Sequence, residues 1–238
     1  MGRAFEVRKA SMAKTSAAKT KVYSRYGREI YVAAKAGVPD PEMNVGLRRI
    51  IDEARAKQVP ADVIKRAIEK AKGGSDESYH ASMYEGFGPG AATVIVSCLT
   101  DNDNRTYSDV RNCFTKSKGK TGVNGSVMHG YDHVGLLTFA HTDEEQIMEI
   151  LLENDVDLKE IEVEEGMMTV TTEPGSLHTA KEALEASLGE INFEELEITY
   201  LPHEYVTLSE EDKPNFEKLL SMLDELDDVQ GYYHNVDM

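Results

Sequence analysis

The alternation of apolar and polar residues in the middle of the chain predicts the beginning of an α/β domain. The apolar, β-branched run Ala91–Leu99 has the length of one buried strand. The glycine-punctuated segment Gly86–Gly90 precedes it and predicts a turn at the start of this strand, where a glycine adopts a positive φ. After the polar turn Thr100–Thr106, Val110 and Phe114 share one face of a predicted helix. We expect Asn104 to cap this helix and Arg105 to reach either a neighbouring domain or a phosphate.

Residues 134–201 show the order strand, helix, strand, strand, helix, strand. Glu165-Gly166 marks the tight turn of the central hairpin. This β-α-β-β-α-β order is that of a ferredoxin-like unit. The predicted elements are Val134–Phe139, Asp143–Asn154, Leu158–Glu164, Met167–Thr172, Leu177–Leu188 and Leu196–Leu201.

The last segment, Val206–Met238, has the pattern of one helix and one strand, with the strand at Val229–Asn235. This segment is too short to bury its apolar face alone, and the segment 91–130 is likewise half of a sheet domain. We therefore predict that the two halves form one domain, with the ferredoxin-like unit inserted between them.

Three helices are predicted at the N-terminal end. Residues 21–36 carry an apolar face formed by Val22, Tyr23, Tyr26, Ile30, Ala33 and Ala34. Asp40-Pro41 has the sequence of a second helix start, and Pro60 of a third, which ends at Gly73-Gly74. Residues 2–20 are small, polar and basic, and we expect them to be weakly ordered alone. The predicted fold class is α+β: a three-helix domain (1–75), a split ferredoxin-like α/β domain (76–130 with 206–238) and an inserted acidic ferredoxin-like domain (131–205).

Charge is strongly segregated along the chain, which the net charge of −17 conceals. Residues 1–75 hold 17 Lys and Arg against 8 Asp and Glu, whereas residues 131–238 hold 4 against 29. Such asymmetry between the two ends is typical of a chain with one end that faces nucleic acid. The acidic half is a candidate surface for a protein partner.

Lysines and arginines of the basic domain are the candidate nucleic-acid contacts. Lys21, Arg25, Arg28 and Lys35 form one stripe on the first helix, opposite its apolar face. A solvated helix face is the alternative explanation, but a domain with this net charge repels itself unless a polyanion binds. The predicted binding residues are Arg8, Lys9, Lys14, Lys19, Lys21, Arg25, Arg28, Lys35, Arg48, Arg55, Lys65, Lys72 and Arg105.

Other motifs do not indicate catalysis or a cofactor. Gly119-Lys120-Thr121 resembles the end of a phosphate-binding loop, but Phe114 occupies the position of the required first glycine. His129 and His133 are four residues apart, but Gly130 argues against a helix that would pair them on a metal. No nucleophile, base and oxyanion site come together in the pattern, so we expect no enzyme, no metal and no cofactor.

Cysteine content and hydropathy indicate the compartment. Cys98 and Cys113 are the two cysteines, one in a predicted strand and one in a predicted helix, and we expect both to be reduced core residues. No apolar run reaches the roughly 18 residues that a membrane helix needs. We expect a cytoplasmic protein, or an organellar one only if a presequence has been removed, that does not associate with membranes.

Several motifs resemble the YebC family in order and spacing. They are Met1–Phe5, Pro39-Asp40-Pro41, Arg66-Ala67-Ile68, Tyr84–Pro89, Leu99-Thr100-Asp101, Asn104-Arg105-Thr106, Gly125-Ser126-Val127, Asp227–Gln230 and Tyr233-His234-Asn235. The resemblance covers nearly the whole chain, and within the family the chain resembles the YeeN-like branch.

The resemblance implies a three-domain plan and a regulator that acts without catalysis. Members of the family are described as bacterial transcriptional regulators and as mitochondrial translational activators. The first hypothesis is therefore a DNA-binding transcriptional regulatory protein, and the second is a ribosome-associated translation factor that binds ribosomal RNA. The charge pattern does not distinguish DNA binding from RNA binding, because phosphate contacts do not detect the 2′-hydroxyl group. A protein-interaction module is a third possibility, but it leaves the basic end without a role.

Overall fold

The computed structural model describes residues 21–73 and 79–237, whose contacts group into two compact units. The first unit comprises the described parts of Met1–Asn124 together with Leu208–Tyr232. The second comprises Gly125–Thr207 with the described part of Tyr233–Met238. The fold is mixed α+β, which confirms the predicted class. The domain boundaries drawn from the sequence stay predictions, and the predicted weak order of residues 2–20 lies outside the described residues.

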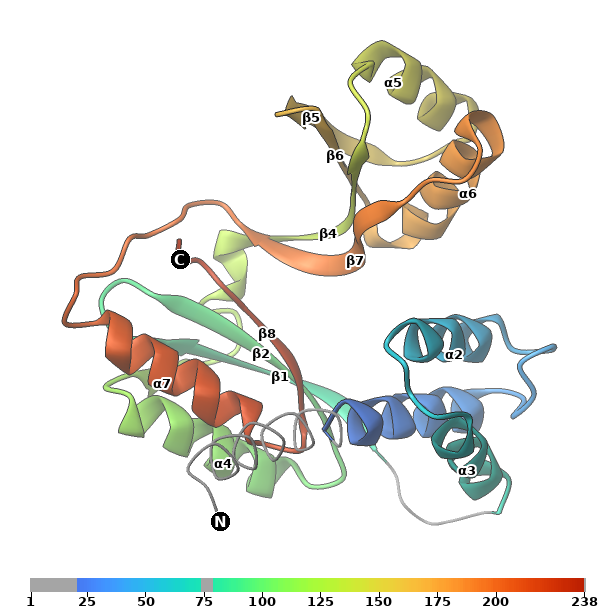
Figure 1. The fold of residues 1–238 in the computed structure, drawn as a ribbon. Helices are drawn as coiled ribbons and strands as arrows, with labels where there is room; N and C mark the ends of the chain where they lie inside the picture. The colour runs from blue at the N-terminus through green and yellow to red at the C-terminus, as the bar shows by residue number, and fades with distance from the viewer. Residues whose placement is uncertain (1–20, 74–78, 238) are drawn as a thin grey trace, which may run out of the picture. The chain divides into compact units, whose positions relative to one another are not determined.

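The first unit begins with three helices: residues 21–36, α2 (Val45–Ala56) and α3 (Ala61–Lys72) (Figure 1). Each helix contributes one apolar face to a shared core. Its buried members are Tyr26, Ile30, Ala34, Leu47, Ile51, Ala54, Val59, Ile64 and Ala67. The predicted apolar face of the 21–36 helix is confirmed, with Val22, Tyr23 and Ala33 packed at its margin.

The ends of these helices follow local capping chemistry. Helix α3 starts after Pro60 and ends at Gly73, as predicted. The start of α2 was predicted wrongly: the helix begins at Val45, and Asn44 is its N-cap, with a side chain that accepts a hydrogen bond from the Leu47 backbone amide at 3.0 Å. The same Asn44 amide donates to the carbonyls of Ala33 and Val38, so it also fixes the preceding loop. Because the Asn44 side chain bonds both to an α2 backbone amide and to carbonyls of the preceding segment, the helix starts there and not at Asp40-Pro41.

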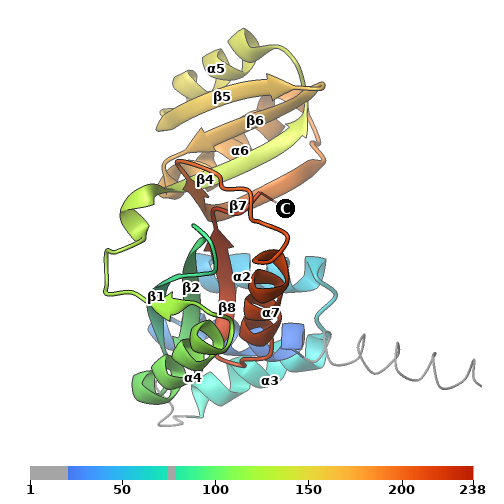
Figure 2. The ribbon, with the colours of Figure 1, turned by 90° about the vertical axis from the view of Figure 1, so that its left-hand side faces the viewer.

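A four-stranded sheet and two helices complete the first unit. Its strands are β1 (His80–Phe87), β2 (Thr93–Thr100), β3 (Lys120–Thr121) and β8 (Val229–His234), in the order β3-β1-β2-β8. Helices α4 (Asp103–Lys116) and α7 (Lys213–Asp224) lie together on one face of this sheet (Figures 1 and 2). The sheet therefore unites strands that precede and follow residues 125–207 in the chain.

Glycine at position 86 is required by packing rather than by a turn. Gly86 lies within β1, and a Cβ atom there would be 2.4 Å from the buried ring of Phe114 on α4. The predicted turn is confined to the end of the glycine-rich segment, where Gly90 has a φ of +65°. Strand β1 was missed because its glycines resemble turn residues.

We expect Gly86→Ala to lower the free energy of unfolding by roughly 1–3 kcal/mol, the usual cost of overpacking a core. The measurement is urea-induced unfolding followed by circular dichroism. Gly231→Ala is the matched control on β8, because a Cβ there meets no atom within 4 Å. Equal stability of the two variants would contradict this account of Gly86.

The second unit is built as the sequence predicts. Its elements are β4 (Tyr131–Ala140), α5 (Glu144–Glu153), β5 (Leu158–Glu164), β6 (Met167–Thr172), α6 (Leu177–Leu188) and β7 (Phe193–Pro202), with short 3-10 turns at Met128–Gly130 and Pro174–Ser176. The strands pair antiparallel in the order β5-β6-β4-β7, the ferredoxin-like arrangement. Helices α5 and α6 cover one face of this sheet (Figure 2) and enclose its core.

Candidate nucleic-acid interface

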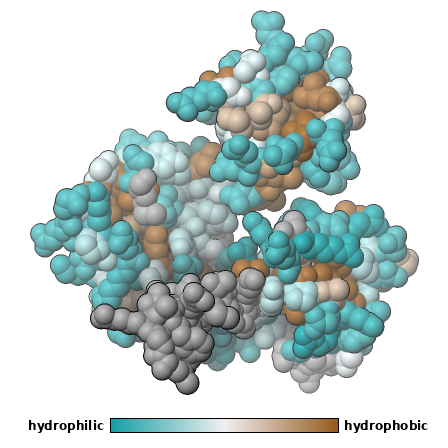
Figure 3. All heavy atoms as spheres, in the orientation of Figure 1, coloured by the Kyte–Doolittle hydropathy of each residue, from teal (hydrophilic) through white to brown (hydrophobic). Residues whose placement is uncertain are grey.

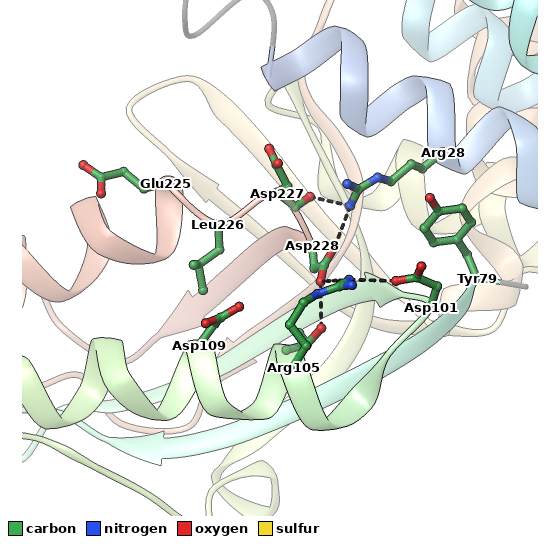
Figure 4. Close-up of a pocket in the computed structure, with 10 residues that line it drawn as sticks. Arg28, Tyr79, Asp101, Arg105, Asp109, Glu225, Leu226, Asp227 and Asp228 are labelled. Atoms are coloured by element: carbon green, nitrogen blue, oxygen red, sulfur yellow. Dashed lines mark hydrogen bonds and ion pairs between the residues drawn. The ribbon is translucent and has the colours of Figure 1, made fainter. Parts of the chain in front are cut away.

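A buried carboxylate, Asp228, organises the region where the 21–36 helix meets the first sheet. Asp228 precedes β8, and its backbone carbonyl accepts a hydrogen bond from the Leu99 amide of β2. Its side chain, 10% exposed, accepts from Arg28 at 2.9 Å, from Arg105 at 2.8 Å and from the Thr106 hydroxyl at 2.7 Å (Figure 4). One carboxylate therefore connects the first described helix, α4 and β8.

The protonation of Asp228 reflects two opposing influences. Burial alone would raise the pKa of this carboxyl. The hydrogen bonds from Arg105 and Thr106, with the positive charges of Arg105 and Arg28, outweigh burial and hold its pKa below the usual value. Asp228 is consequently ionised at neutral pH.

Arg105 and Arg28 hold this carboxylate from two sides. Arg105 also bonds to Asp101 at 2.7 Å, and both carboxylates raise its pKa. Arg28, whose side chain is 20% exposed, also donates to the carbonyl of Asp227 at 2.7 Å, and its guanidinium lies 5.5 Å from the centre of the Tyr79 ring. The sequence left two destinations open for Arg105, and in the structure it reaches the segment that precedes β8.

Helix α4, which carries Arg105, starts two residues earlier than expected. Asn102 is its N-cap and accepts from the Arg105 amide at 3.1 Å, so the prediction of Asn104 as the cap was wrong. Thr100 supports this start, because its hydroxyl accepts from the Asn102 amide and lies 2.7 Å from the Thr106 hydroxyl. The Asn102 cap places Arg105 and Thr106 in the first turn, where both side chains contact Asp228.

A cavity of about 460 Å³ adjoins this network (Figure 4). Its wall contains two guanidinium groups against five carboxylates. The residues that line it are Arg28, Tyr79, Asp101, Arg105, Thr106, Asp109, Glu225, Leu226, Asp227 and Asp228. This excess of negative charge repels phosphate, so the cavity is not a site for a nucleic-acid backbone.

Lys21 lies against the same acidic segment. Its amine is buried, and no acceptor for it is found among residues 21–73 and 79–237. Burial lowers the pKa of Lys21, although the nearby carboxylates of Asp224, Asp227 and Glu225 oppose the shift. Lys21 and Arg28 of the predicted basic stripe thus face the protein's own carboxylates, so this half of the stripe is not an open solvated face.

The remaining predicted cations of the three-helix region occupy different settings. Arg25 pairs with Glu29 and Arg55 with Asp52 on the surface. Arg48 donates to the carbonyls of Pro41 and Glu42, which closes the loop before α2. Lys35 bonds to the Tyr31 hydroxyl at 3.2 Å. Arg8, Lys9, Lys14 and Lys19 lie outside the described residues.

Lys65 and Lys72 are exposed, and no ion pair or hydrogen bond of either side-chain amine is found within the described chain. They are seven residues apart on α3, about 20° short of two full turns, so they project from the same side of the helix. Lys57, at the end of α2, is also exposed, and its side-chain amine likewise has no partner within the described chain. It was not predicted as a binding residue. We call these three residues the open lysines.

Besides Lys57, sequence reasoning missed Asp228 and Tyr79. The only signal for Asp228 was its place in the family-like motif Asp227–Gln230, and nothing in the pattern identified its two arginine partners. Tyr79 packs edge-on against Tyr31, with ring centres 6.0 Å apart. It therefore links the three-helix core to the start of β1.

Other chemistry finds little support among the residues the structure describes. Nowhere in them do three or more His, Cys, Asp or Glu side chains gather in a way that could hold a metal ion. None of the described helices combines the length and hydropathy needed to cross a lipid bilayer. Cys98 in β2 and Cys113 in α4 are buried free thiols, as predicted, and burial raises the pKa of Cys98 to about 12.

Comparisons with known proteins cover the whole chain. Residues 3–74 match the model of the TACO1/YebC protein N-terminal domain, and residues 79–236 match that of the TACO1/YebC second and third domain. A protein of Alcanivorax borkumensis, named probable transcriptional regulatory protein, is 52% identical over 238 residues and covers all of both chains. A protein of Acholeplasma laidlawii with the same name is 52% identical over 237 residues, which cover 99% of this chain and 98% of its own.

A solved structure agrees in fold as well as in sequence. The crystal structure of a conserved hypothetical protein from Aquifex aeolicus superposes with a TM-score of 0.75 at 35% identity, covering 94% of this chain and 93% of the other. Resemblance to the YeeN-like branch stays a prediction. Together, the two domain models and the full-length relatives show that this chain belongs to the TACO1/YebC family.

Proposed function

We propose that this chain is a non-enzymatic transcriptional regulator that binds duplex DNA through phosphate contacts from its three-helix region. The observation that carries the proposal is the set of open lysines, Lys57, Lys65 and Lys72, in a segment with a net positive charge. Exposed lysines without carboxylate partners keep their full attraction for phosphate. The names of the full-length relatives support the regulatory role.

Contacts of this kind position a protein on DNA without reading its sequence. Phosphate contacts carry no base information, so they supply affinity and orientation. Arginines that face internal carboxylates, such as Arg28 and Arg105, contribute less to binding, because phosphate would have to displace an existing partner. The face drawn in Figure 3 is mostly hydrophilic, with smaller apolar patches, which is compatible with phosphate contacts made in water.

The test is the salt dependence of binding. Changing Lys57, Lys65 and Lys72 together to Gln should reduce the slope of log K against log salt by about 0.9 per lost contact on duplex DNA. The three exposed changes should leave the free energy of unfolding within about ±0.5 kcal/mol each. Fluorescence anisotropy with a labelled duplex, from low to moderate salt, measures the slope.

A matched control removes the same charge elsewhere. Lys159, Lys181 and Lys213 each pair with a glutamate outside the three-helix region, and their change to Gln should leave the slope unchanged. An equal change of slope in both variants would mean that net charge, not the open lysines, governs binding. A loss confined to structured RNA would contradict the DNA proposal and favour a role in translation.

A further inference from the structure

The second unit has a sheet face that its own helices do not cover. Helices α5 and α6 pack on one face of the sheet, against Leu137, Phe139, Met168 and Val170. Successive residues of a strand point to opposite faces, so the alternate residues of these strands face away from the helices. The register of the four strands identifies which side chains share this second face.

Glutamates lie along both margins of this face. One row across the sheet reads Glu162, Thr169, Thr138 and Glu195, and the next reads Glu160, Thr171, Leu136 and Glu197. Glu164 begins a third row, beside Met167 and Ala140. All five glutamates are exposed. The two outer strands therefore carry carboxylates, and the inner strands carry uncharged side chains. Of the inner residues, Thr171 and Leu136 are only 8% and 7% exposed, whereas Thr169 and Thr138 are half-buried and Ala140 is exposed, so the accessible floor of the face lies at the rows of Thr169 and Ala140.

These carboxylates are not neutralised by the unit's own cations. Residues 125–207, all of which the structure describes, contain 2 lysines and no arginine against 20 Asp and Glu. Both lysines pair with other carboxylates, Lys159 with Glu173 and Lys181 with Glu185. At the margin itself, the Thr138 hydroxyl donates to Glu195 at 2.9 Å, which fixes that carboxylate over the row.

The dimensions of the face fit one α-helix. Three inter-strand spacings separate β5 from β7, about 14 Å in total. An α-helix with its side chains is about 10–12 Å across. Successive rows on this face are two strand residues apart, about 6.6 Å. Residues four apart on an α-helix are separated by about 6 Å along its axis, so their side chains can reach successive glutamates.

We propose that this acidic sheet face binds a lysine- or arginine-rich helix of a partner protein. The helix lies along the strands, with its short side chains over Thr169 and Thr138 and its cations directed to the glutamates on both margins. Nucleic acid does not suit this face. Sheets of this type bind single-stranded RNA by stacking bases on aromatic residues, whereas the rows described here carry carboxylates and no aromatic side chain.

The experiment uses the full chain and a labelled, alanine-based helical peptide with lysine at every fourth position. Fluorescence anisotropy gives its Kd for the unmodified protein and for the variant in which Glu160, Glu162, Glu195 and Glu197 are Gln. We expect the variant to bind about tenfold more weakly or worse, because four charge pairs at a surface are lost. Thr169→Lys, which places a cation between the margins, should weaken binding while preserving the glutamates.

The matched control changes the same number of exposed glutamates on the helical side of the unit. Glu144, Glu145, Glu149 and Glu153 of α5 become Gln, with the same change of net charge. Binding that survives this control and fails in the face variant supports the proposal. Equal weakening in both would overturn it, since net charge alone would explain the effect. Loss of self-association in the face variant, seen by sedimentation without peptide, would instead make a second copy the occupant and overturn the assignment to another protein.

Discussion

Replacement of Asp228 with alanine is expected to lower the free energy of unfolding by roughly 2–3 kcal/mol. Breaking a fully buried ion pair costs about 3–5 kcal/mol, whereas an exposed pair contributes at most about 1 kcal/mol. Asp228 falls between these cases, since its side chain is 10% exposed while that of Arg105 is 48% exposed. The variant would leave Arg28, Arg105 and Thr106 without their shared acceptor.

The pH dependence identifies the charge of Asp228 as the source of this effect. Its pKa is held below the usual value, so its contribution is present above the unfolded-state pKa of about 3.9 and is lost as the pH falls through the lower folded-state pKa. The stability difference between the wild type and Asp228→Asn should therefore be constant near neutral pH and narrow only below about pH 4. Urea unfolding at several pH values measures this difference.

Asp101→Asn is the control for this experiment. Asp101 also pairs with Arg105, but its side chain is 40% exposed, and its ion pair is with Arg105 rather than with Arg28. It should change the unfolding midpoint far less than Asp228→Asn does. If the two variants lost the same amount of stability, the burial of Asp228 between Arg28 and Arg105 would not explain the destabilisation of Asp228→Asn.

The order of elements in the second unit could be predicted from sequence, and some of its bounds to the residue, although β4 and β7 each begin three residues before the predicted start. Strands Leu158–Glu164 and Met167–Thr172 were predicted with the bounds that the structure gives. The reason is local: alternation specifies the strands, and Glu165 and Gly166, with φ of 51° and 85°, form the turn that the dipeptide predicts. Where the hydrophobic pattern and the turn residues agree, the bounds of an element can be predicted without knowing which distant residues contact it.

The basic stripe shows where local reasoning ends. Helix periodicity placed Lys21 and Arg28 away from the apolar face, and this spacing does not reveal what lies opposite them. Arg28 pairs with Asp228, 200 residues further along the chain. Only the folding of the C-terminal segment onto β2 brings the two together. The same limit applies to Gly86. Only glycine fits at this position because the Phe114 ring, which belongs to another element, occupies the space that a Cβ would need.

Deletion of residues 1–75 is expected to abolish binding to nucleic acid while leaving a folded remainder. The remainder, 76–238, holds 9 Lys and Arg against 35 Asp and Glu, so it repels phosphate at any ordinary salt concentration. Its first sheet should persist, because β8 remains paired with β2 and Asp228 keeps Arg105 and Thr106. Loss of Arg28 should lower its thermal midpoint relative to the full chain.

The full-length variant Arg28→Ala separates lost stability from lost binding. It removes the same contact to Asp228 but retains the open lysines Lys57, Lys65 and Lys72. We expect it to melt earlier than the wild type and to bind duplex DNA with nearly the same salt slope. Circular dichroism gives the melting temperatures, and anisotropy with a labelled duplex gives the slopes. A truncated protein that binds DNA as tightly as the full chain would place the interface outside the three-helix region. Loss of DNA binding by Arg28→Ala at a temperature where it is fully folded would instead place Arg28 itself on the nucleic acid, in exchange for Asp228.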